Sequence, residues 1–136
     1  MREIKFRAWD KKNKIMGNVL IIDHVGEATE GLVIEHKKVA YDLDFKKDYI
    51  LMQYTGLKDK DGKEIYEGDI VKISHRYKGR KHTGAIIWNV YEWHVANFYF
   101  SHYDNPASAF SEGTNNKDVK FEIIGNIYEN PELVAK

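Results

Sequence analysis

Apolar and polar residues alternate along the start of the chain. Over residues 2–9 every second side chain is apolar on one side of the segment: Ile4, Phe6 and Ala8. A repeat of two residues is typical of a strand with one buried face. A polar stretch then leads to a second apolar run over residues 15–22, which Gly17 interrupts. We therefore predict a β-hairpin with a bulge or bend at Gly17.

The clearest turn signal lies in the middle of the chain. Asp61 and Gly62 can adopt the positive φ values of a tight hairpin turn, with apolar residues on either side. Short apolar runs at residues 32–35 and 49–54 precede this turn, and another at residues 70–73 follows it. We predict that each of these runs is a strand.

The last third of the chain continues the same alternation of short strands and turns. Further strands are predicted at residues 84–88, 91–100 and 121–128, and a long polar loop at residues 101–119. Short strands separated by turns indicate a barrel or small sandwich rather than a βαβ fold. We therefore predict a mainly β protein with an SH3-like C-terminal barrel and an N-terminal β-hairpin region. The expected parts are an N-terminal β region, a hairpin connector and the barrel, at residues 1–53, 54–67 and 68–136.

Charge and composition limit the class of protein. The chain has 136 residues, of which 21 are basic and 21 acidic, so its formal net charge is zero. Dedicated nucleic-acid-binding domains usually have a strong basic excess, so total charge argues against that class without excluding a local basic patch. The chain has no cysteine, which excludes disulfides and cysteine-ligated zinc. No apolar run approaches the roughly 18 residues of a membrane span and no signal peptide is recognisable, so we expect a cytoplasmic protein without a membrane partner.

Three ordered segments of the chain carry a resemblance to a known family. They are REIKFRAWDKKNKIM at residues 2–16, QYTGLKD with DGKEIYEGDIV at residues 53–71, and IGNIYENPEL at residues 124–133. Together they resemble the signature of the YopX family of phage and prophage proteins. The resemblance implies an SH3-like C-terminal barrel after an N-terminal β region, in a bacterial host cell. It supplies no catalytic residue that can be transferred to this sequence.

A basic segment, HRYKGRKH at residues 75–82, lies between two predicted strands. Its candidate nucleic-acid contacts are Arg76, Tyr77, Lys78, Arg80 and Lys81. The cations can neutralise phosphates, and the tyrosine can stack on a base. A solvated hairpin tip explains the same residues without a partner. We favour that interpretation because one loop gives few phosphate contacts.

No residue pattern predicts a chemical activity. Asp59 and Asp61 resemble the start of a calcium loop, but glycine is fourth rather than sixth and the twelfth position is Ile70. The histidines form no HExxH pattern, and P-loop, nucleophile-elbow and GxGxxG patterns are absent. We therefore expect no catalytic residue, no metal ligand and no cofactor, and an enzyme is the least favoured hypothesis.

Aromatic side chains gather in the second half of the chain: Tyr91, Trp93, Phe98, Tyr99, Phe100 and Phe110. Some of them can fill a core, and an exposed remainder would favour a homo-oligomer or a phage or host protein partner. The main hypothesis is a non-catalytic binding or assembly module. The alternative is a nucleic-acid-binding accessory protein that uses the hairpin at residues 75–82.

Overall fold

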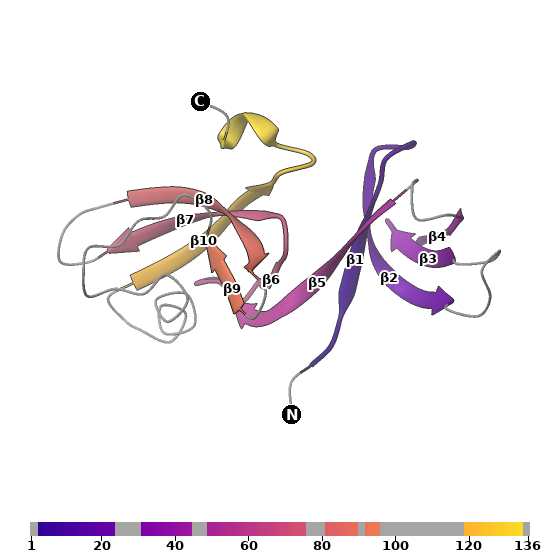
Figure 1. Cartoon of the computed structure of the whole chain (residues 1–136), viewed down its shortest axis with the longest axis horizontal. Coiled ribbons are helices and arrows are strands. Elements are labelled where there is room, and N and C mark those ends of the chain that lie inside the picture. The colour runs from indigo at the N-terminus through magenta and orange to yellow at the C-terminus, as the bar shows by residue number, and fades with distance from the viewer. Residues whose placement is uncertain are drawn as a thin grey trace. The chain divides into compact units, whose positions relative to one another are not determined.

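The computed structural model describes residues 3–23, 31–44, 49–75, 81–89, 92–95 and 119–134 of the chain. Antiparallel strands dominate these residues, which confirms the prediction of a mainly β protein. Their only helix is the short 3-10 helix η1 (Pro131–Leu133). The chain divides into two compact units, Met1–Tyr54 and Thr55–Lys136 (Figure 1).

The first unit is built on an antiparallel sheet. Its strands are β1 (Phe6–Asp10), β2 (Ile15–Asp23), β3 (Gly31–His36), β4 (Val39–Asp44) and β5 (Tyr49–Lys58). The sheet order is β4-β3-β2-β1-β5-β6, where β5 continues into the second unit and β6 is the short strand Glu64–Tyr66. The predicted first hairpin is confirmed, because β1 pairs with β2.

A small core holds the first unit together. Ala8 on β1 and Ile34 on β3 are fully buried at its centre. Partly buried side chains pack around them: Ile15, Val19, Tyr41 and Tyr49. Of the predicted buried face, Ala8 is buried and Phe6 is partly buried, whereas Ile4 is 68% exposed. Trp9, on the other face, is buried as well, so the prediction of a single buried face on the first strand is wrong.

The irregular position in β2 is not the predicted one. Gly17 keeps a regular register with β1, whereas the register shifts between Val19 and Ile21. The predicted bulge at Gly17 is therefore wrong in place. Gly17 instead permits close packing, because a Cβ atom there would lie 2.9 Å from the Ile34 side chain and from the Glu35 carbonyl oxygen.

Replacing Gly17 by alanine tests this packing. We expect Gly17→Ala to lower the free energy of unfolding by about 2 kcal/mol, because a backbone oxygen cannot move aside as a flexible side chain can. Urea denaturation followed by circular dichroism measures the change. The exposed neighbour Asn18 provides the control, as Asn18→Ala. Equal stability of the two variants would contradict the packing argument.

The second unit contains a sheet ordered β10-β7-β8-β9. Its strands are β7 (Asp69–His75), β8 (Lys81–Asn89), β9 (Glu92–Val95) and β10 (Val119–Asn126). The strands predicted at residues 70–73 and 84–88 are confirmed and extend further than predicted. The last strand ends at Asn126 rather than at residue 128, because residues 127–129 form a turn.

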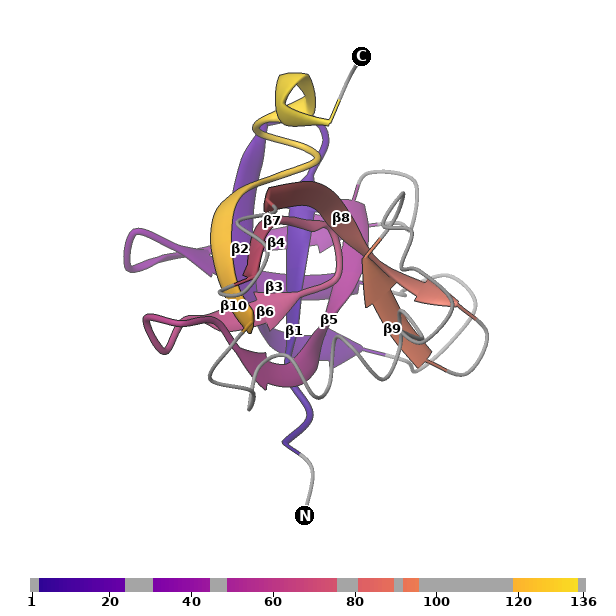
Figure 2. The ribbon, with the colours of Figure 1, turned by 90° about the vertical axis from the view of Figure 1, so that its left-hand side faces the viewer.

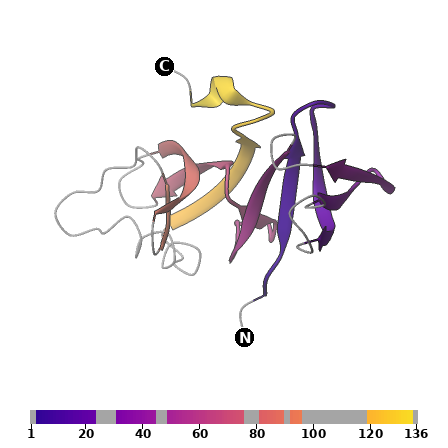
Figure 3. The ribbon, with the colours of Figure 1, turned by 45° about the vertical axis from the view of Figure 1, so that its right-hand side comes forward.

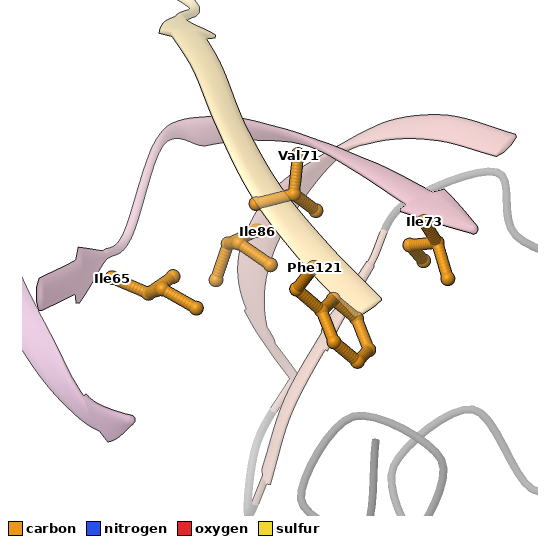
Figure 4. Close-up of a cluster of buried hydrophobic side chains, with 5 residues drawn as sticks. All are labelled: Ile65, Val71, Ile73, Ile86 and Phe121. Carbon is orange, nitrogen blue, oxygen red and sulfur yellow. The ribbon is translucent and has the colours of Figure 1, made fainter. Parts of the chain in front are cut away.

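The core of the second unit collects side chains from four strands, β6, β7, β8 and β10 (Figure 4). Each of these side chains is at most 2% exposed: Ile65, Val71, Ile73, Ile86 and Phe121. Burial of one such side chain stabilises a fold by about 1.5–3 kcal/mol. Because β10 and β6 are far apart in sequence, this core depends on long-range contacts.

Candidate functional site

The predicted basic hairpin lies mostly outside the described residues. Arg76, Tyr77, Lys78 and Arg80 are among the residues that the structure leaves out, while Lys81 begins β8 and is exposed. The strands on either side do pair, with Ser74 opposite Lys81. This pairing confirms that β7 and β8 form a hairpin, although His75, Lys81 and His82 belong to its strands rather than to the predicted loop. Contact with nucleic acid stays a prediction.

The predicted aromatic surface is also largely outside the described residues. Tyr91, Phe98, Tyr99, Phe100 and Phe110 all fall there. The backbone of Trp93 lies in β9, opposite Trp88 in β8. A role of these aromatic residues in an interface stays a prediction.

All five buried polar side chains of the described residues bond to the backbone. They are Asp10, Thr55, Asp59, Asp69 and Asn126. Thr55 Oγ1 donates to the Ile65 carbonyl at 2.7 Å, and Asp69 Oδ2 accepts from the Tyr66 amide at 2.8 Å. A buried polar group is costly unless it forms hydrogen bonds, so these partners explain why the residues are tolerated in the interior.

Asp59 joins the central turn to the last strand. Its Oδ1 accepts from the amides of Asp61 and Lys63, each at 2.9 Å, and its Oδ2 accepts from the amide of Ile123 in β10 at 3.1 Å. Gly62 alone supplies a positive φ to this turn, 82°. The expected tight turn with positive φ at both Asp61 and Gly62 is therefore wrong, because residues 59–63 together connect β5 to β6. Both carboxylate oxygens are therefore engaged by backbone N–H groups, which explains the aspartate without a calcium ion.

A second polar turn follows β10. Asn126 Oδ1 accepts from the amides of Tyr128 and Glu129, at 3.1 and 2.9 Å. Asn130 Oδ1 accepts in return from the Asn126 amide at 3.2 Å. A Cβ atom at Gly125 would lie 2.6 Å from that same oxygen, so a side chain there would displace the Asn130 side chain. The residues of IGNIYENPEL thus build a turn.

Asp10 organises the turn between β1 and β2. It is fully buried, and its Oδ1 accepts from the amides of Lys12 and Asn13, at 3.0 and 3.2 Å. Its Oδ2 accepts from Asn13 Nδ2 at 2.8 Å, and the Lys14 amide donates to the Asp10 carbonyl at 2.9 Å. The turn is therefore held in one conformation by a single buried carboxylate and its own backbone.

Two hairpin tips of the first unit contain lysine where glycine or asparagine is usual. Lys37 and Lys38 join the His36–Val39 pair of β3 and β4, with φ values of 51° and 66°. Two central residues with positive φ make a type I′ turn, which favours Asn-Gly. Lys14 ends the β1–β2 turn with φ 59°. Every residue other than glycine that has positive φ in the described segments is thus a lysine.

The two turns form a basic end of the first unit's sheet. We call them the lysine tips; their lysines are Lys11, Lys12, Lys14, Lys37 and Lys38, all exposed. His36 Nδ1 lies 2.8 Å from the Met16 carbonyl oxygen, which ties β3 to β2 beside both turns. Figures 2 and 3 show the β1–β2 tip pointing upward and the β3–β4 tip pointing sideways. The lysine tips were not predicted from the sequence, although the runs KKNK and KK were their signal.

The backbone strain at the β3–β4 tip predicts a stabilising substitution. We expect Lys37→Asn with Lys38→Gly to raise the free energy of unfolding by about 1–2 kcal/mol, because the left-handed conformation costs a residue with a side chain roughly that much. Urea denaturation measures the change. The matched control, Lys37→Ala with Lys38→Ala, removes the same charges but keeps the unfavourable φ values. An equal gain in the control would assign the effect to charge repulsion.

The described residues contain neither a cluster of metal ligands nor a membrane-spanning helix. No group of three His, Cys, Asp or Glu side chains lies close enough to hold a metal ion within the segments that the structure describes. In those segments no helix has the length and apolar composition to cross a membrane.

A family model described as YopX protein matches residues 5–135 of the chain. The chain belongs to the YopX family. This result confirms the resemblance noted in the sequence, and it covers both units. No curated protein sequence gives a significant match.

Two solved structures of similar proteins cover nearly the whole chain. Protein EF1440 from Enterococcus faecalis is 27% identical, with a TM-score of 0.61 over 99% of this chain and 100% of that one. Protein YopX from Bacillus subtilis is 24% identical, with a TM-score of 0.65 over 96% of this chain and 98% of that one. The second likeness shows a shared fold. Neither description assigns a biochemical role.

Proposed function

We propose that this YopX-family chain is a non-catalytic binding or assembly module encoded by a phage or prophage. The observation that supports it best is the use of the buried polar side chains. Asp10, Asp59 and Asn126 each accept hydrogen bonds from two or more backbone amides of a turn. The oxygens of Asp10 and Asp59 are thus occupied in holding backbone turns, which leaves little of either carboxylate available to a substrate.

Self-association is the form of assembly that the first unit favours. Leu20 and Ile21 lie at the bulge of β2 and are 53% and 59% exposed. Because of the register shift, Ile21 pairs with Val33 and is exposed, whereas Val19 packs against the core of the first unit. Strand β4 is at the edge of the sheet, and an edge strand can pair with another chain. A net charge of zero gives little repulsion between two copies.

Sedimentation over a range of protein concentrations tests this proposal. We expect the average mass to rise with concentration, and Leu20→Thr with Ile21→Thr to weaken the association at least tenfold, because apolar area leaves the interface. Threonine keeps the β propensity of the strand. Ile87→Thr, which changes an exposed residue of β8, is the control. A monomer at every concentration would overturn self-association.

The second candidate function is nucleic-acid binding by residues 75–82. The pairing of β7 with β8 on either side of this basic segment favours it. Filter binding at low and moderate salt would compare the chain with a variant in which four cations are neutralised: Arg76, Lys78, Arg80 and Lys81. Equal retention of DNA by the two proteins would reject this candidate.

We also propose that β6 to β10 build an SH3-like barrel. The support is the antiparallel order β10-β7-β8-β9 and the core that these strands share with Ile65 of β6. An experimental structure of the whole second unit would test it. A flat sheet without closure would reject the barrel.

A further inference from the structure

The lysine tips are without acidic partners among the residues that the structure describes. None of their five lysines forms an ion pair in the described part of the chain. Among the described residues, two carboxylates belong to the same end of the sheet, Asp10 and Glu35. Asp10 is buried and bonded to the turn backbone, and Glu35 is exposed in β3. The local balance is therefore basic in a chain whose total charge is zero.

Acidic residues occupy the opposite end of the same sheet. Asp23 ends β2 and Asp44 ends β4, and both pair with Gly31 at the start of β3. Asp42 lies two residues before Asp44 on β4. Along the strands of this sheet, the lysine tips and these acidic residues therefore stand at opposite ends of the backbone register.

We propose that the lysine tips bind the phosphate backbone of a nucleic acid, without reading its sequence. Three of the five lysines adopt positive φ, so the chain keeps cations at positions where other residues would be more stable. Backbone strain of this kind is often found where function requires it. The Asp10 hydrogen bonds fix the β1–β2 tip before a ligand arrives, which lowers the entropy lost on binding.

The separation of the tips suits a nucleic acid. The path from Lys14 through Met16 and the His36 contact to Lys37 limits the Cα–Cα distance to about 20 Å. Duplex DNA carries one negative charge per roughly 1.7 Å of its axis, so one molecule offers phosphates to both tips.

A membrane is the less suitable anionic surface. The β1–β2 tip consists of Lys11, Lys12, Asn13 and Lys14, and the β3–β4 tip of Lys37 and Lys38. Basic segments that lie in a membrane interface combine cations with several apolar side chains that insert, whereas the large exposed apolar side chain beside the tips in the described residues is Val39 alone.

Fluorescence anisotropy with the full chain tests the proposal. The probes are a labelled 20-nucleotide DNA strand, the corresponding duplex and vesicles with anionic lipid. We expect the wild-type chain to bind DNA at 50 mM salt and to lose roughly 100-fold or more in affinity at 200 mM, as about five phosphate contacts predict. Lys37→Asn with Lys38→Gly should weaken binding roughly tenfold and reduce the salt slope by about 1.4 for the strand or 1.8 for the duplex.

The controls separate charge, position and folding. Lys37→Ala with Lys38→Ala should lose as much DNA affinity, although only the Asn-Gly variant melts at a higher temperature than the wild type. Lys58→Asn with Lys63→Asn removes two exposed lysines of the second unit and should bind normally. Equal loss in this last variant, no DNA binding at 50 mM salt, or vesicle binding as tight as DNA binding would each overturn the proposal. Self-association is measured separately, so its failure leaves this inference intact.

Discussion

Asp59→Ala is expected to lower the free energy of unfolding by about 3 kcal/mol, since it leaves three backbone amides without their acceptor. The amides belong to Asp61, Lys63 and Ile123, and the Asp59 side chain that they bond is largely buried. Urea denaturation gives the total change. Amide hydrogen exchange should also accelerate at Lys63 and Ile123, because both lose a protecting bond.

Two further variants isolate the cause of that loss. Asp59→Asn keeps one side-chain oxygen, so its cost should lie between those of the wild type and the alanine variant. Asp61→Ala removes an exposed carboxylate that only approaches Lys60 at 3.5 Å, and it should change stability by less than about 0.5 kcal/mol. If Asp59→Ala lowered the free energy of unfolding as little as Asp61→Ala, the Asp59 carboxylate would not be the group that connects the turn to β10.

Asp10→Ala should destabilise the first unit by about 3 kcal/mol, because a fully buried acceptor disappears and the amides of Lys12 and Asn13 lose their partner. Urea denaturation measures the change, and exchange at the two amides reports it locally. Asn13→Ala is the matched control, since it removes only the bond from Asn13 Nδ2. A loss of at most about 1 kcal/mol is expected there. Equal effects would place the stabilisation in the amide side chain instead.

Together these variants separate scaffold from surface. The Asp10 and Asp59 variants act on turns that hold each unit, whereas the lysine variants change a charged surface that the scaffold presents. Loss of DNA binding in a variant that is more stable than the wild type cannot arise from unfolding. The variant with the stabilising Asn-Gly turn is therefore the most informative single protein for function.

The β3–β4 hairpin was not predicted from the sequence, for a physical reason. Strand β4 alternates apolar and polar residues from Tyr41 onward, yet its connection to β3 lacks a turn signal. The pattern that predicts a two-residue hairpin needs Asn, Asp or Gly, because these residues adopt positive φ easily. Here Lys37 and Lys38 adopt positive φ values, so the turn can be recognised from the backbone conformation and not from the residue types.

The position of the bulge in β2 was mispredicted for a related reason. Glycine in a strand favours two explanations, a bulge or the close approach of another group, and the sequence cannot distinguish them. At Gly17 the deciding fact is the position of Ile34 on the neighbouring strand. Regular alternation would place Ile21 on the same face of β2 as Val19. The register shift between these two residues interrupts that alternation, and Ile21 is exposed.

The mainly β class, the first hairpin and a turn at Gly62 could be predicted because each depends on residues close together in the chain. Membership of the YopX family could be predicted because three ordered segments carry its resemblance. Which side chains meet follows only from the fold. Asp59 binds Ile123 across 64 residues, and the two lysine tips share one end of a sheet through strand register. Register follows from packing across strands, and a period-two pattern does not encode it. The fold was therefore largely predictable from local pattern, whereas the site required the pairing of distant strands.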